Sequence, residues 1–261
     1  MKIAAAVEYC GSHFHGWQRL KNDRSVQQCI EEALSKVANQ TINVSCAGRT
    51  DAGVHARYQI IHFETDSPRK MHSWVFGANA NLPSDVSLLW AKLVEDDFHA
   101  RFLATARTYT YVILNRSARP ALHHPLLTWE RRPLDVSLMS RAAAHLLGKH
   151  DFTSFRAQAC QSQSPVREIY ELTVERHDKY VMVNVRANAF LYHMVRNIAG
   201  VLIAIGSGNK EADWARQVLQ AKDRARAGVT APPTGLYLVN VEYPERFELP
   251  LAEVSSFPLP G

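Results

Sequence analysis

The segment Gly48–His55, which reads GRTDAGVH, sets a carboxylate close to an arginine in a stretch bounded by glycines. Asp51 follows Arg49 by two residues, and Gly48 and Gly53 allow a tight turn. A nearby guanidinium favours the ionised form of an aspartate, which can then act as a nucleophile or an electrostatic stabiliser. A structural role is also open, because an aspartate in a turn can cap a helix or accept backbone N–H groups.

The stretch 101–132 combines arginines with tyrosines and contains a single acid, Glu130. If the segment RTYTY is a strand, Arg107, Tyr109 and Tyr111 share one face. Arginine forks next to aromatic rings suit the phosphate and the base of an extruded or single-stranded nucleotide. The alternative is a half-exposed strand with large β-forming residues and a solvated arginine. The six arginines of the stretch are Arg101, Arg107, Arg116, Arg119, Arg131 and Arg132.

The composition favours a globular protein with an anionic partner. The chain has 261 residues, of which 46% are hydrophobic and 21% charged, and its formal net charge is +5. A positive balance of this size favours a polyanion such as nucleic acid without proving one. The four cysteines are widely spaced and form no CxxC pair, which argues against a zinc ribbon and indicates reduced thiols in a cytoplasmic protein.

The most apolar stretch, Phe190–Gly206, is shorter than a bilayer span and carries polar residues, so we expect a buried helix and no membrane segment. His193 lies one turn before Asn197 and is interpreted as a hydrogen-bonded core histidine. Arg196 is harder to place, because a charge in an apolar helix needs a partner. We predict that this partner is Asp51.

No metal site is expected. The pairs His13–His15 and His123–His124 lack a third ligand at a suitable spacing, and we interpret them as loop histidines. A single aspartate flanked by arginine is also not the carboxylate cluster of a two-metal enzyme.

Strands and helices interleave along the chain, and one pair of strands forms a hairpin, which favours the α+β class. We expect two α+β halves, residues 1–105 and 106–261, that share a continuous, mostly antiparallel mixed sheet flanked by helices, with a basic cleft between them. Strands are expected at Lys2–Tyr9, Ile42–Cys46, Tyr58–Thr65, Ser87–Val94, Thr108–Leu114, Ile169–Arg176, Tyr180–Ala187 and Leu236–Tyr243. Helices are expected after Ser25 and at Lys70–Ala78, Ser137–Leu147, Phe190–Gly206 and Glu211–Ala221.

The segment AGRTDAGVHA, Ala47–Ala56, resembles the signature of the tRNA pseudouridine synthase A family. Further similar segments follow in chain order over nearly the whole chain, so the resemblance does not rest on one motif. They are VEYCGSHFHGWQ, ANANLPSDV, FHARFLATARTYTY, GKHDFTSFR, SPVREIYEL, FLYHMVRNIAGVLIAIGSG and APPTGLYLVNVEY.

The resemblance implies the pseudouridine synthase fold and an isomerisation that converts uridine to pseudouridine. Uracil is detached from ribose at N1, turned, and reattached through C5, with no redox change and so no cofactor. The implied substrate is the anticodon stem-loop of tRNA at uridines 38, 39 and 40. The family acts as a homodimer, and we expect a cytoplasmic enzyme with no membrane association.

The resemblance also implies a role for four residues. Asp51 occupies the position of the covalent nucleophile, and whether it attacks C6 of uracil or C1′ of ribose stays open. Arg49 matches an arginine that helps to extrude or hold the nucleotide, which must leave its stack. Tyr109 matches a tyrosine that stacks on the flipped base and is a candidate for proton transfer from C5. Arg196 matches an arginine that pairs with the catalytic carboxylate.

One departure from the family pattern is Cys10, which stands where an aspartate is usual, so an acid is lost from that loop. We interpret it as a difference in RNA contact or loop packing. The basic run that contains Lys222, Arg224 and Arg226 is either a solvated helix end or a tRNA backbone contact. The alternative function is a non-catalytic RNA-binding protein or chaperone, which gains nothing from an anion such as Asp51 in a phosphate-binding cleft.

Overall fold

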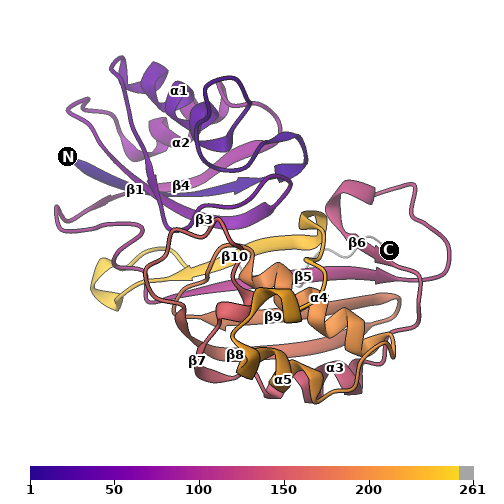
Figure 1. Ribbon diagram of the computed structural model, residues 1–261. Coiled ribbons are helices and arrows are strands. Elements are labelled where there is room, and N and C mark those ends of the chain that lie inside the picture. Colours follow the sequence, from indigo (N-terminus) through magenta and orange to yellow (C-terminus); the bar gives the residue numbers. More distant parts are fainter. Residues whose placement is uncertain (253–261) are drawn as a thin grey trace. The chain divides into compact units, whose positions relative to one another are not determined.

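The computed structural model of the chain describes residues 1–252, which divide into two compact units (Figure 1). The first unit contains residues 1–105 together with 237–252, and the second contains residues 106–236. Each unit combines helices with mostly antiparallel strands, which confirms the α+β class. The shared sheet and the basic cleft between the two halves stay predictions.

The first unit is built on strand β1, whose sequence KIAAAVEY buries its alanines completely. β1 pairs antiparallel with β3 on one side and with β4 on the other, and β2 pairs antiparallel with β3. Helices α1 and α2 lie together over one face of these strands (Figure 1), and α2 packs against β4. The elements are β1 (Lys2–Tyr9), α1 (Val26–Ala38), β2 (Ser45–Cys46), β3 (His55–Glu64), α2 (Met71–Asn79) and β4 (Val86–Val94).

The last strand, β10 (Leu236–Glu242), corrects the predicted division of the chain. We expected the second half to run from residue 106 to 261, but residues 237–252 belong to the first unit. The reason is that β10 pairs in parallel with β3, Tyr237 opposite His55 and Leu238 opposite Ala56. Local sequence signals cannot show such a pairing, because it joins segments about 180 residues apart.

The second unit contains an antiparallel sheet in the order β5-β9-β8-β7, with the short strand β6 parallel to β5. The expected hairpin joins β8 to β9 through Asp178, which takes the left-handed conformation with φ 51°. Three helices pack with one another beside this sheet (Figure 1). The elements are β5 (Ala106–Asn115), β6 (Thr128–Glu130), α3 (Val136–Ala144), β7 (Gly148–Asp151), β8 (Val166–His177), β9 (Tyr180–Ala187), α4 (Met194–Gly206) and α5 (Trp214–Ala221).

Short 3₁₀ turns connect several of these elements. They are η1 (Gly11–His13), η2 (His124–Leu126), η3 (Thr153–Phe155), η4 (Arg224–Arg226), η5 (Pro233–Gly235) and η6 (Glu245–Phe247).

Among the elements that are shorter than expected, two have identifiable reasons. The strand expected at Ile42–Cys46 is reduced to Ser45–Cys46, because the N–H groups of Ile42 and Val44 bond to side chains of helix α1. The helix expected at Phe190–Gly206 begins only at Met194, because His193 takes a left-handed conformation with φ 62°. This helix, α4, has 13 residues, and no helix within residues 1–252 is long and apolar enough to cross a membrane.

Candidate active site

The GRTD segment forms a loop between β2 and β3 that is fixed on both sides of Arg49. On one side, the buried Gln59 side chain donates to the Gly48 carbonyl at 2.6 Å and accepts from the Gly48 N–H at 3.3 Å. On the other side, the Thr50 hydroxyl lies 2.7 Å from the Tyr9 hydroxyl, and the Thr50 carbonyl accepts from the Trp17 N–H at 3.0 Å. Tertiary hydrogen bonds therefore hold the backbone of this loop in place.

Asp51 is half-buried at the tip of this loop, whereas Arg49 is exposed. The Asp51 carbonyl accepts from the Val54 N–H at 3.2 Å and closes a turn, in which Gly53 has φ 79°. The turn leads into strand β3 and not into a helix, so helix capping is excluded as the role of Asp51. A carboxylate on a fixed turn next to an exposed guanidinium is suited to meet an extruded nucleotide.

The loop that follows β1 lies directly against the GRTD loop through Gly16, which has φ 95°. A Cβ added to Gly16 would lie 2.9 Å from the Thr50 carbonyl oxygen and 3.2 Å from the Asp51 carbonyl carbon. Only glycine permits this combination of a positive φ and a close backbone approach.

Replacement of Gly16 by alanine should therefore displace Asp51 as well as destabilise the fold. Gly208 is the matched control, because it also has a positive φ, 77°, but open space around it. Gly208→Ala should cost about 1 kcal/mol for the backbone strain alone and leave kcat unchanged. Gly16→Ala should cost about 1–3 kcal/mol more from overpacking and lower kcat. Urea unfolding and pseudouridine formation check both, and equal effects of the two variants would show that the close approach is unimportant.

Cys10, which stands in place of the usual aspartate, has neighbours that lower the pKa of its thiol. A hydrogen bond with His55 is the largest of the causes that lower the pKa of the Cys10 thiol to about 7, and its Sγ lies 3.3 Å from the Ser12 hydroxyl. His55 is buried, accepts from the Gly11 N–H through Nδ1 at 3.0 Å, and stacks on Tyr237 at 4.6 Å. The sequence did not indicate that His55 contacts Cys10 and Tyr237, because Tyr237 reaches His55 only through the pairing of β10 with β3.

Two histidines hold the turn at residues 98–102, His62 from strand β3 and His99 from within the turn itself. The N–H of Ala100 donates to Nδ1 of His62 at 3.1 Å, and the N–H groups of Arg101 and Phe102 donate to Nδ1 of His99 at 3.1 and 3.3 Å. Burial lowers the pKa of His62 to about 4, and it also lowers the pKa of His99. Both rings are therefore neutral near pH 7 and can accept these bonds.

The lowered pKa of His62 predicts a loss of stability in acid. Below pH 6.5 the unfolded chain protonates this histidine, whereas the folded protein keeps it neutral until about pH 4, so stability falls as the pH falls through that window. The pKa difference corresponds to about 3 kcal/mol. His62→Asn should weaken the dependence of the unfolding free energy on pH between 7 and 4, and His72→Asn, at an exposed position, should not. Equal pH slopes in both variants and the wild type would contradict the assignment.

Tyr109 lies on β5 opposite Val185, with 8% of its surface exposed. Its ring meets Phe190 edge to face at 5.1 Å, and two residues earlier Arg107 donates to the Asn188 carbonyl at 2.8 Å. Tyr111 is fully buried, and its hydroxyl lies 2.7 Å from the Thr128 hydroxyl and 2.8 Å from the Pro232 carbonyl. Tyr111 is therefore a core residue, and Tyr109 is the candidate for substrate contact.

Arg196 lies in the first turn of α4 and is half-buried. Its Nε donates to the Ala231 carbonyl at 2.8 Å, and its own carbonyl accepts from the Ala231 N–H at 3.1 Å. One turn later, a Cβ on Gly200 would lie 2.0 Å from the Val229 carbonyl oxygen, so the helix and this segment are in close contact. The side chain thus has an oriented backbone partner within its own unit, and its pairing with Asp51 stays a prediction.

Several polar residues of the second unit have structural roles. The buried Asn197 donates to the Phe155 carbonyl at 2.7 Å and accepts from the Arg224 guanidinium at 3.0 Å. Arg224 is therefore not simply a solvated helix end, because it ties η4 to α4. His193 stands at the N-cap of α4 with its ring 4.0 Å from that of Tyr192, so it is not a residue of the helix core.

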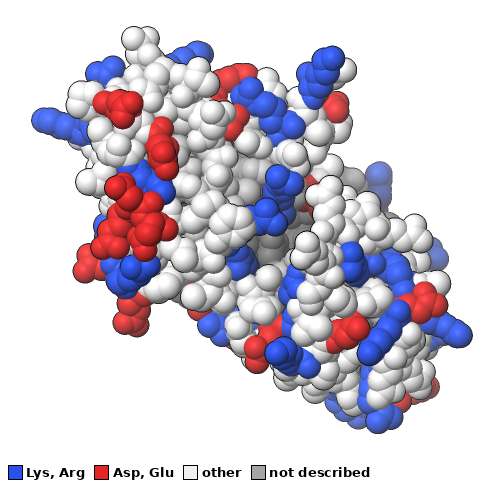
Figure 2. All heavy atoms as spheres, turned by 60° about the vertical axis from the view of Figure 1, so that its left-hand side comes forward, with Lys and Arg blue, Asp and Glu red and all other residues white. Residues whose placement is uncertain are grey.

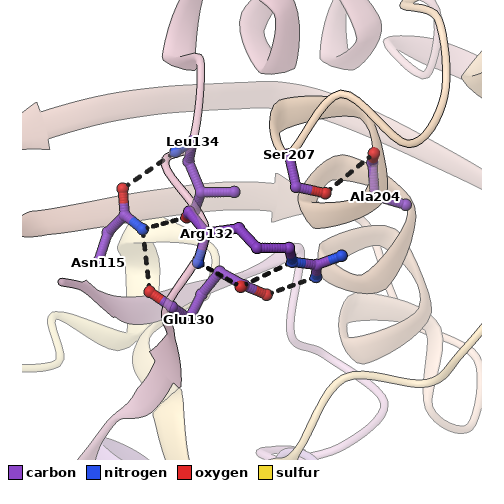
Figure 3. A network of polar contacts seen from close by, with 6 residues as sticks. All are labelled: Asn115, Glu130, Arg132, Leu134, Ala204 and Ser207. Atoms are coloured by element: carbon purple, nitrogen blue, oxygen red, sulfur yellow. Dashed lines mark hydrogen bonds and ion pairs between the residues drawn. The ribbon is translucent and has the colours of Figure 1, made fainter. Parts of the chain in front are cut away.

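Not every arginine side chain in the stretch 101–132 is available to bind phosphate. Figure 3 shows Arg132 in a two-pronged ion pair with Glu130, with N–O distances of 2.9 and 2.6 Å. Asn115 braces the same segment by donating to the carbonyls of Glu130 and Arg132 and accepting from the Leu134 N–H. Hydrogen bonding from Arg132 lowers the pKa of Glu130. Elsewhere, lysine and arginine side chains are spread widely over the face in Figure 2, whereas acidic side chains gather toward its left.

The structure places the four predicted site residues in two sets. Arg49 and Asp51 lie on the GRTD loop of the first unit, and Tyr109 and Arg196 lie on β5 and α4 of the second. Their assembly into one site stays a prediction.

Comparisons with known proteins identify the family of the chain. The sequence profile of a tRNA pseudouridine synthase family matches residues 5–103 and 142–244. Relatives called tRNA pseudouridine synthase A include one from Coxiella burnetii, 54% identical over 99% of both chains, and one from Nitrosococcus oceani, 56% identical over 96% of both. One from Vibrio atlanticus is 51% identical over 100% of this chain and 98% of its own.

Among solved structures, a chain of a Cbf5-Nop10-Gar1 complex overlaps 77% of this chain and 54% of its own length. Its TM-score of 0.32 and its identity of 11% are too low to carry an argument. The family profile and the near full-length relatives carry the assignment instead. On their strength the chain belongs to the tRNA pseudouridine synthase family, whose members are isomerases that convert uridine to pseudouridine in tRNA.

Proposed function

We propose that this enzyme isomerises uridines 38, 39 and 40 in the anticodon stem-loop of tRNA, with Asp51 as its covalent nucleophile. The observation that carries the proposal is the GRTD loop itself. Its Gly48 and Thr50 are held by hydrogen bonds to Gln59, Tyr9 and Trp17, so the backbone that carries the half-buried Asp51 is fixed. A fixed nucleophile lowers the entropic cost of attack.

The reaction balances without a cofactor. The N1–C1′ bond breaks, a C5–C1′ bond forms, N1 gains a proton and C5 loses one. Asp51 adds either to C6 of the base or to C1′ of the ribose, and both routes end with release of the carboxylate. Either route predicts loss of the hydrogen at C5, so one assay serves for both.

The other three residues support this chemistry in our proposal. Arg49, exposed two residues before Asp51, holds the extruded nucleotide by its phosphate. Tyr109 stacks on the uracil and takes part in removal of the C5 proton. Arg196, whose guanidinium is oriented by the Ala231 carbonyl, pairs with the carboxylate of Asp51. We further propose that the enzyme acts as a homodimer, as the family resemblance implies.

The test is release of tritium from tRNA labelled at C5 of uridine. Transcripts that carry uridine at only one of positions 38, 39 and 40 should each release tritium, and a transcript with uridine only outside the anticodon stem-loop should not. Release from the last transcript alone would overturn the proposed positions. Tight tRNA binding with no release from any transcript would favour the alternative of a non-catalytic RNA-binding protein.

A further inference from the structure

The turn at residues 98–102 exposes an aromatic ring in a fixed setting. Phe102 is 73% exposed, yet its backbone N–H and that of Arg101 are both bound by His99. The rings form a series in which His99 lies 4.6 Å from His62 and 4.2 Å from Phe102. The Arg101 guanidinium lies 5.7 Å from the centre of the Phe102 ring. This turn therefore presents an aromatic face and a cation together.

The turn also lies close to the GRTD loop within the first unit. His62, which binds the N–H of Ala100, is paired with Ser45 of β2, and the next residue of that strand is Cys46. Burial raises the pKa of the Cys46 thiol to about 12, and the guanidiniums of Arg49 and Arg101 both act on it in the opposite direction. Arg101 and Arg49 are thus both close enough to Cys46, the last residue of β2, for their charges to act on its thiol, and the chain continues from there to Asp51.

Extrusion of a uridine leaves a neighbouring base with one face bare. An exposed aromatic ring can stack on such a face whichever base is present, and an arginine beside it can bind the adjoining phosphate. Phe76 on α2 is equally exposed, at 73%, but it has no ring or cation contact with the described residues, so exposure alone does not single out Phe102.

We propose that Phe102 and Arg101 form a docking platform for a tRNA nucleotide next to the target uridine, Phe102 stacking on its base and Arg101 binding its phosphate. This inference rests on the proposed action of Asp51 on an extruded uridine. Both residues are positioning residues, because they hold the RNA while Asp51 meets the reacting atoms.

The experiment measures KM and kcat for unmodified tRNA in three variants. Phe102→Ala should raise KM about tenfold, which is within the range for loss of one stacked base, and should change kcat less. Phe102→Trp should restore KM, because its ring also stacks. Phe76→Ala is the matched control and should leave KM unchanged. Equal KM values for Phe102→Ala and Phe76→Ala would overturn the proposal, as would a loss of kcat at constant KM in both Phe102 variants.

Arg101 is tested by the salt dependence of tRNA binding. Arg101→Gln should reduce the slope of log Kd against log salt concentration by about 1, the value for one phosphate contact. Arg101→Lys should keep the slope. An unchanged slope in Arg101→Gln would overturn the phosphate contact. Failure of this inference is distinct from failure of the proposed function, because the wild type would then still release tritium from the anticodon stem-loop.

Discussion

Asp51→Asn should reduce the rate of pseudouridine formation by at least about 10⁴-fold, the scale expected when a nucleophile is removed. The amide keeps the size of the side chain but cannot add to carbon as a carboxylate does. The fold should survive, because the backbone of the loop is anchored through Gly48 and Thr50, and both residues are unchanged in this variant. Binding of tRNA should be retained or slightly stronger, since a negative charge is removed from a phosphate-binding region.

The measurement is kcat by nucleoside analysis of the tRNA product, with Kd from filter binding. Asp66→Asn, at an exposed position of the same unit, is the control and should keep full activity. A rate within tenfold of the wild type in Asp51→Asn would contradict the nucleophile assignment. Loss of activity in both variants would instead point to a general effect of charge.

Tyr109→Phe should bind tRNA normally and lose turnover by about 10²–10⁴-fold, the usual contribution of a general acid or base. The phenylalanine ring still packs edge to face on Phe190 and still offers a surface for stacking, so the substitution removes only the hydroxyl. Measurement of kcat and Kd separates the two roles. Unchanged turnover would reduce Tyr109 to a stacking surface.

Tyr111→Phe is the matched control, two residues further along the same strand. Tyr111 is fully buried and its hydroxyl has two partners, the Thr128 hydroxyl and the Pro232 carbonyl, so its loss should cost about 1–3 kcal/mol of stability. Turnover at a permissive temperature should remain close to that of the wild type. The two substitutions should thus have different effects: Tyr109→Phe should lower the rate of catalysis, and Tyr111→Phe should lower the stability of the fold.

The sequence predicts the local elements well where a regular apolar pattern or a cap is present. Ser25 accepts from the Gln28 N–H at 3.4 Å and begins α1 as the capping-box spacing indicates. The errors arise where contacts between distant segments compete with local preference. Ile42 and Val44 bond to α1 and leave the strand, and β10 pairs in parallel with β3.

In the candidate site, too, local motifs could be predicted and contacts between distant segments could not. The GRTD motif identifies Asp51 and Arg49 because their chemistry lies within one short segment. The role of His55 beside Cys10 and the influence of Arg101 on Cys46 were missed, because both depend on how strands pair. The partner of Arg196 within its unit, the Ala231 carbonyl, could not be predicted either, since a backbone group carries no signal in the sequence.

The central claim is that Asp51 forms the bond that starts the isomerisation, and a single-turnover experiment tests it most directly. Wild type and Asp51→Ala, each in excess over tRNA labelled with tritium at C5 of the uridines, are compared for the rate of tritium release. The wild type should release the label from one turnover, and Asp51→Ala should bind the tRNA and release none above background. Release by Asp51→Ala at a rate near that of the wild type would contradict the claim.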